Sequence, residues 1–191
     1  MSVHEGALFP LWGAQEGPWS ARRIDPGNPA DNAGECVEIH GVLDPGLFEV
    51  ALRRAIDETQ TLARRCTDAP ARPRVLLDPG AYWPMRSVDV SAAVDPRAAA
   101  RAWIAADLAS AVDLDDGPLY SQALFRAAHD RWLWFLRAHH LLLDDHSYQL
   151  VARRVVEVYT ALAAGRPVPT ARFCTPRQTR RTEQRGRRHD G

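Results

Sequence analysis

Two adjacent histidines and a nearby carboxylate are the residues of this sequence best suited to carry chemistry. They lie in the stretch His139-His140-Leu-Leu-Leu-Asp144-Asp145, after a largely apolar run and before a run of helical spacing. A junction of this kind between a strand and a helix is a common place for a site, because rigid elements hold the loop. A neutral imidazole there could take a proton from a nucleophile. The stretch therefore predicts acid–base or positioning chemistry.

Strand alternation predicts which histidine faces a cleft. Successive strand residues point to opposite faces, so at most one of His139 and His140 can face a common cleft. Counting back by two, His140 shares its face with Leu136, Trp134 and Trp132. We expect this apolar surround to disfavour the imidazolium form and to keep the His140 ring neutral.

The elements that must position these residues alternate between strand and helix. Strands are predicted over about 35–42, Val75–Asp78, Arg86–Val90, Leu119–Ala127 and Arg131–His139, and helices over about 45–59, 95–110 and 146–164. Asp44-Pro45 and Asp95-Pro96 are helix-start signals. The order favours an α/β fold in which a mixed sheet is layered with helices.

The last predicted helix should present one apolar face to the sheet. Its inward positions fall three or four apart and are Tyr148, Val151, Val155, Val158 and Leu162. Arg153, Arg154 and Glu157 fall elsewhere on the helix, so we expect them outside the core.

Composition limits the other function classes. The 191 residues are 46% hydrophobic, which is enough for a core, and no apolar run is long enough to span a membrane. The three cysteines, Cys36, Cys66 and Cys174, are widely spaced and are interpreted as reduced thiols. We expect a soluble cytoplasmic protein. The histidine spacing does not match a zinc site, so no metal is predicted, although His140, Asp144 and His146 remain a sterically conceivable set.

The C-terminal segment differs in charge from the rest of the chain. All 24 basic residues are arginines, and residues 166–191 carry a net charge of +6 against −6 for residues 1–165. Clustered arginines attract phosphate, but residues after Cys174 offer nothing apolar to pack. We predict that residues 170–191 form a disordered tail and that nucleic acid is not the partner. A shifted reading frame is one hypothesis for its composition.

The histidine stretch resembles the HHxxxDG motif of condensation domains of nonribosomal peptide synthetases, which are chloramphenicol acetyltransferase-like acyltransferases. The resemblance extends in order over about residues 8–169. It includes Leu11 through Trp19, Asp25 through Asn32, Gly41 through Asp44, Leu114 through Leu119, and Tyr159 through Gly165. It implies the N-terminal lobe of such a domain over residues 1–169.

This resemblance implies amide formation between a carrier-bound acyl thioester and a carrier-bound amino acid. His140 would take a proton from the amine or stabilise the intermediate, with His139 beside it. The resemblance implies that Asp144 is structural and pairs with an arginine, for which Arg64 and Arg65 are the candidates. No cofactor is bound directly; the phosphopantetheine arms of carrier proteins are the substrates, and carrier proteins or synthetase modules are the partners.

Two departures from the family bear on activity. Asp145 replaces the glycine of the motif, which carries a steric cost if that position needs a positive φ. The second lobe of the cleft is also expected to be missing, so the chain would need a complementing C-terminal lobe to be active. A noncatalytic remnant or carrier-protein interaction module, and a fragment of a related acyltransferase, are the alternatives.

Overall fold

The computed structural model describes residues 8–10, 28–59, 62, 64–67, 74–77, 84–114 and 118–171. For residues 8–10, 64–67, 74–77 and 145 only the backbone is described. The elements follow in the order β1 (Leu8–Pro10), a 3-10 helix (Pro29–Asp31), β2 (Asn32–His40), α2 (Pro45–Thr59), β3 (Arg64–Thr67), β4 (Arg74–Leu77), β5 (Arg86–Asp89), α3 (Pro96–Leu108), β6 (Tyr120–Ala128), β7 (Arg131–His139) and α4 (Asp145–Ala163).

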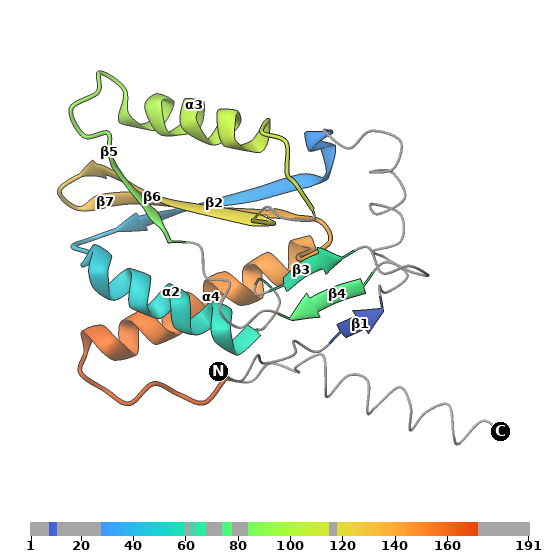
Figure 1. The fold of residues 1–191 in the computed structure, drawn as a ribbon. Helices are drawn as coiled ribbons and strands as arrows, with labels where there is room; N and C mark the ends of the chain where they lie inside the picture. The colour runs from blue at the N-terminus through green and yellow to red at the C-terminus, as the bar shows by residue number, and fades with distance from the viewer. Residues whose placement is uncertain are drawn as a thin grey trace, which may run out of the picture.

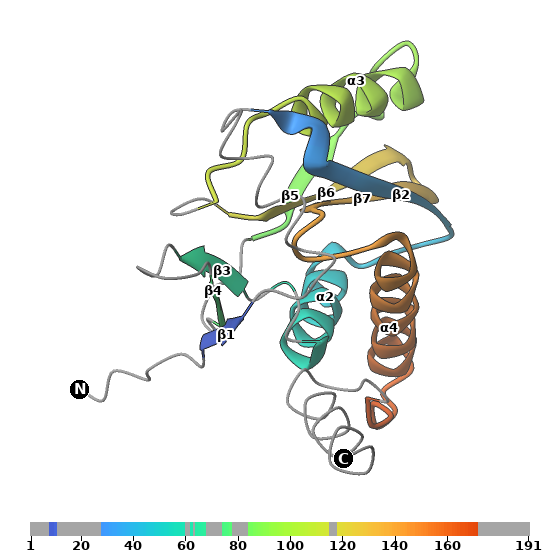
Figure 2. The same cartoon turned by 90° about the vertical axis from the view of Figure 1, so that its right-hand side faces the viewer.

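The central layer is a four-stranded mixed sheet in the order β2-β7-β6-β5. Strand β7 pairs antiparallel with β2 on one side and with β6 on the other, whereas β5 runs parallel to β6. Helix α3 covers one face of this sheet, and α2 and α4 lie side by side on the other (Figures 1 and 2). The predicted layered α/β fold is confirmed.

A second, smaller sheet corrects one part of the prediction. The segment predicted at Val75–Asp78 forms β4, which pairs with β1 and β3 in a separate antiparallel sheet and not with the main sheet. Strands β1 and β3 were not predicted. Each has only three or four residues, which is too short for an alternating pattern to be distinctive.

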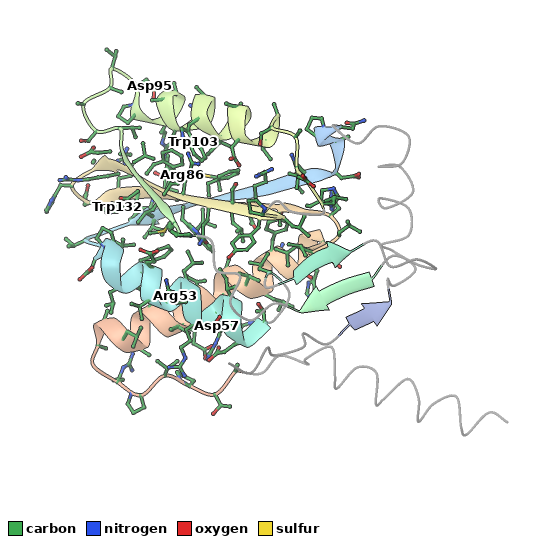
Figure 3. All side chains as sticks on the ribbon, in the orientation of Figure 1. Arg53, Asp57, Arg86, Asp95, Trp103 and Trp132 are labelled. Atoms are coloured by element: carbon green, nitrogen blue, oxygen red, sulfur yellow. The ribbon has the colours of Figure 1, made fainter. Side chains whose placement is uncertain are left out.

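The core consists of two apolar layers, one on each face of the main sheet. Between the sheet and helices α2 and α4, the largest buried side chains include Phe48, Leu52, Ile56, Tyr120 and Leu124. On the other face, Trp103 of α3 packs edge-on against Phe125 and Phe135. Figure 3 shows Trp103 between α3 and the sheet, with Arg86 beside it, and the guanidinium carbon of Arg86 lies 5.9 Å from the Trp103 ring.

The predicted helix starts are confirmed by their hydrogen bonds. Asp44 Oδ1 accepts a hydrogen bond from the amide of Leu47 at 3.0 Å, and Asp95 Oδ1 accepts one from Ala98 at 2.9 Å. Each carboxylate satisfies an amide that has no partner inside its helix. These caps fix where α2 and α3 begin.

Arg154 on α4 corrects the expectation that it lies outside the core. Its side chain is only 2% exposed. It donates to Glu58 of α2 at 2.6 Å, to Glu157 at 2.7 Å and to the carbonyl oxygen of Pro169 at 2.8 Å. A helical pattern of apolar residues cannot indicate a buried charge of this kind, because the burial depends on acceptors supplied by α2 and by the segment after α4.

Candidate functional site

Strand β7 ends at His139, and the chain then turns towards α4. The amide of His139 donates to the carbonyl oxygen of Leu119 at 2.9 Å, and the amide of His140 donates to that of Asp31 at 2.8 Å. Leu142 donates in turn to the carbonyl oxygen of His139 at 2.8 Å. The backbone of both histidines is therefore held by the residues that immediately precede β6 and β2.

The two histidine side chains lie in different environments. His139 is 6% exposed, and its Nδ1 accepts a hydrogen bond from the amide of Leu141 at 3.2 Å. Because Nδ1 is an acceptor there, the proton of a neutral His139 ring lies on Nε2. His140, in contrast, is exposed. Of the two residues, His140 is therefore the one exposed at the surface.

The exposure of His140 corrects its predicted apolar surround. Trp132, Trp134 and Leu136 are buried in the core between the sheet and helices α2 and α4. His140 does not join their face because the strand ends one residue earlier. Leu141, Leu142 and Leu143 are buried, so they draw the turn towards the core and leave His140 at its outer edge.

Asp144 fixes the start of α4 and with it the end of the histidine turn. Its Oδ1 accepts hydrogen bonds from the hydroxyl of Ser147 at 2.5 Å and from the Ser147 amide at 2.8 Å. These two hydrogen bonds lower the pKa of the Asp144 carboxyl. The negative charge also lies favourably at the positive end of the helix dipole.

The remaining predicted site residues differ in what the structure says of them. Asp145 is the first residue of α4 and has helical backbone, which any residue adopts, so the steric cost of a positive φ does not arise. Arg64 and Arg65 begin β3. Their side chains lie outside the described residues, and so does their predicted pairing with Asp144. The predicted tail, residues 170–191, is described only as far as residue 171.

Sequence reasoning missed a polar cluster beside the histidines. Arg137, two residues before His139, is buried, and its Nε lies 2.9 Å from Asp107 Oδ2 of α3 and 3.1 Å from Ser121 Oγ of β6. The sequence offers one sign of this cluster, because Arg137 is the single charged residue in the otherwise uncharged run from Trp132 to Ala138.

Among the residues that the structure describes, no three His, Cys, Asp or Glu side chains gather closely enough to hold a metal ion.

The model of the condensation domain family matches residues 7–176 of this sequence. The chain belongs to the condensation domain family. It is 41% identical to the isonitrile lipopeptide synthase of Streptomyces coeruleorubidus over 96% of its own length and 13% of that protein. It is 39% identical to a dimodular nonribosomal peptide synthase of Bacillus subtilis over 86% of its length and 7% of that protein.

Solved condensation domains have the same fold. The crystal structure of the starter condensation domain of rhizomide synthetase matches with a TM-score of 0.88 and 35% identity, over 94% of this chain and 44% of that one. The first condensation domain of the CDA synthetase matches with a TM-score of 0.81, over 89% of this chain and 43% of that one. The chain thus spans less than half the length of these domains.

Among its described residues, no helix is long and apolar enough to cross a membrane.

Proposed function

We propose that this condensation-domain lobe presents His140 to an amine nucleophile during amide-bond formation in nonribosomal peptide synthesis. The observation that carries the proposal is the difference between the two histidines: His139 is buried and its Nδ1 holds the turn, whereas His140 is exposed at the strand end. Membership of the condensation domain family supports this reaction class. The substrates are an acyl thioester and an amino acid, each on the phosphopantetheine arm of a carrier protein.

For each amide bond made, one proton must move from the amine to the departing sulfur. The amine nitrogen attacks the thioester carbonyl carbon, the carbon–sulfur bond breaks, and an amide and a thiol result. A neutral imidazole of His140 accepts the proton that the amine loses and returns it to the departing sulfur. Alternatively, the ring donates a hydrogen bond that stabilises the developing oxyanion. Either role requires His140 to lie within hydrogen-bond reach of the reacting atoms.

We further propose that this lobe needs a second lobe to be active. A general base contributes about 10²–10⁴-fold to the rate, whereas holding two substrates in the reacting geometry contributes about 7–11 kcal/mol. A single exposed histidine beside one wall of a cleft supplies only the first contribution. We therefore expect negligible product from the 191-residue chain alone.

The test joins residues 1–169 to the C-terminal lobe of a related condensation domain. Two loaded carrier proteins are supplied, and the amide product is measured by mass spectrometry. An octanoyl-loaded donor should be compared with an aminoacyl-loaded one, because variants of the rhizomide starter domain have been solved in complex with C8-CoA. We expect product from the chimera, and a loss of most of it on His140→Ala.

Two control variants sharpen this test. His129 is exposed in the turn between β6 and β7, at the other end of the hairpin from the histidine pair, so His129→Ala should leave product formation unchanged. Asp144→Ala should act mainly by loosening the start of α4. An unimpaired His140→Ala chimera would reject the catalytic role. A folded chimera that binds carriers without forming product would instead favour a carrier-interaction module.

A further inference from the structure

The contact between α3 and the sheet changes from apolar to polar along β7. Leu133 and Phe135 of β7 are buried with Ala100 of α3 in an apolar cluster. The next residues on the same face of β7 are Arg137 and then His139. The polar part of this interface is therefore next to the histidine turn.

Three polar side chains from three elements meet at this end. Arg137 is 5% exposed, and its Nε lies 2.9 Å from Asp107 Oδ2 of α3. The same Nε donates to Ser121 Oγ of β6 at 3.1 Å, and the Ser121 hydroxyl donates to Asp107 Oδ2 at 2.5 Å. Each of the three side chains thus contacts the other two.

Asn32 joins the C-terminal end of α3 to strand β2. Its Nδ2 donates to the carbonyl oxygens of Leu108 at 3.0 Å and Ser110 at 2.8 Å, at the C-terminal end of the helix. Asn32 pairs with His139 in the register between β2 and β7. We call Asn32, Asp107, Ser121 and Arg137 the α3 clamp, because together they join the end of α3 to β2, β6 and β7.

The backbone of the histidines depends on the same strand ends. His140 donates to Asp31, the residue before Asn32 of the clamp. His139 donates to Leu119, two residues before Ser121. A shift of β2 or β6 at this end would therefore move the hydrogen-bond acceptors that hold His139 and His140.

Stability alone does not account for the α3 clamp. Burying a guanidinium and a carboxylate costs desolvation that their attraction often only balances. Among the residues that the structure describes, the buried Arg137 Nη1 and Asn32 Oδ1 have no hydrogen-bond partner, which adds to the cost. Next to the clamp, the same interface is apolar at Ala100, Leu133 and Phe135. Directional contacts, unlike apolar ones, fix one relative placement of helix and strands.

We propose that Asp107, acting through Arg137 and Ser121, is a positioning residue that fixes the placement of His140. The proposal rests on the proposed function in taking His140 as the catalytic group. The proposal also gives α3 a part in that function, although α3 lies on the opposite face of the sheet from α4 (Figure 2).

The test uses the 191-residue chain with the double substitution Asp107→Leu and Arg137→Met, which removes both charges together. Backbone amide exchange is measured residue by residue by NMR. We expect exchange at His140 and Leu142 to accelerate by about tenfold, while the midpoint of thermal unfolding is unchanged or higher. Unchanged exchange at both residues, or equal acceleration at core residues such as Phe125, would overturn the proposal.

A matched control lies at the other end of α3. Arg97 contacts both carboxylate oxygens of Glu38 on β2, at the end of the sheet remote from the histidines. The double substitution Glu38→Leu and Arg97→Met should leave His140 exchange unchanged. Ser121→Ala removes one hydroxyl from the clamp and should give a smaller acceleration in the same residues, which keeps the test decisive if the double variant does not fold.

A second measurement uses the two-lobe chimera. The double clamp variant should lower kcat while leaving KM for the loaded carriers nearly unchanged, because the surfaces that bind the carriers are not altered. An unchanged kcat together with faster His140 exchange would overturn the catalytic part of the proposal. If the unsubstituted chimera forms no product, the proposed function fails, and the exchange measurement still decides whether the clamp positions the turn.

Discussion

The backbone amide of Ala138 on β7 donates a hydrogen bond to the hydroxyl of Tyr148 on α4 at 2.8 Å. The hydroxyl in turn donates to the carbonyl oxygen of Ala33 on β2 at 2.6 Å. Tyr148 of α4 is thus inserted between β2 and β7 where these two residues pair. This inserted hydroxyl joins α4 to the sheet two residues before His140.

Removing this hydroxyl should destabilise the fold. Tyr148→Phe keeps the ring but leaves the buried amide of Ala138 and the carbonyl of Ala33 to find other partners. We expect the free energy of unfolding in urea to fall by about 1–3 kcal/mol. Tyr159→Phe is the control, because the Tyr159 hydroxyl accepts an exposed hydrogen bond from Asp44 at 3.0 Å. For Tyr159→Phe the free energy of unfolding should fall by less than about 1 kcal/mol. Equal losses for the two variants would contradict the argument.

Arg154 should be the most costly arginine of α4 to replace. Burial alone would raise the pKa of Glu58, and the hydrogen bonds from Arg154 and Arg54 outweigh that effect, so the pKa is lowered. Arg154→Met leaves Glu58 partly buried with only Arg54, and we expect a loss of about 2 kcal/mol in urea unfolding. Arg153→Met, at the exposed neighbouring position, should change stability by less than about 0.5 kcal/mol.

Acid should weaken the start of α4. The pKa of Asp144 is lower in the folded protein than in the unfolded chain, so its contribution is present above the unfolded value and is lost as the pH falls through the folded value. The stability difference between the wild type and Asp144→Ala should be about 1 kcal/mol at pH 6 and should shrink below about pH 4.

Asp144→Asn is the control for this pH dependence. Asparagine caps helices about as well as aspartate but does not titrate. Its stability relative to Asp144→Ala should therefore not depend on pH in the acid range. If the free energy of unfolding of the wild type changed with pH in parallel with that of Asp144→Asn between pH 6 and pH 2.5, the capping argument would be refuted.

Gly34 of β2 is required by the close approach of an aromatic ring. A Cβ at this position would lie 2.6 Å from Phe135 Cε2 and 3.1 Å from Leu108 Cδ2. The Phe135 ring packs against Trp103 and cannot move freely. Gly34→Ala should therefore cost about 1–3 kcal/mol in thermal or urea unfolding. Gly46→Ala, in the first turn of α2, should be neutral or stabilising because its nearest neighbour would be Asp44 Oδ1 at 3.4 Å.

Periodicity predicted the main elements because their inward faces are apolar and regular. The predicted inward face of α4 from Tyr148 to Val158 is buried as expected. Strand β7 has the predicted bounds, whereas β2 runs over Asn32–His40 and not over about 35–42. The failures concern residues whose placement depends on distant partners. Arg154 is buried because Glu58 and Pro169 supply acceptors. His140 is exposed because Leu141 to Leu143 turn inward one residue after β7 ends. A local pattern contains neither relationship.

The long pairing between β2 and β7 has a consequence for folding during synthesis. Residues 32–40 pair with residues 131–139, which are made about a hundred residues later. At about 5–20 residues per second, β2 waits for roughly 5–20 s on the ribosome before β7, the strand with which it pairs in the main sheet, exists. Throughout that interval Val37 and Ile39 have no sheet to pack in, so the nascent chain is most open to chaperones and to aggregation before the histidine strand emerges.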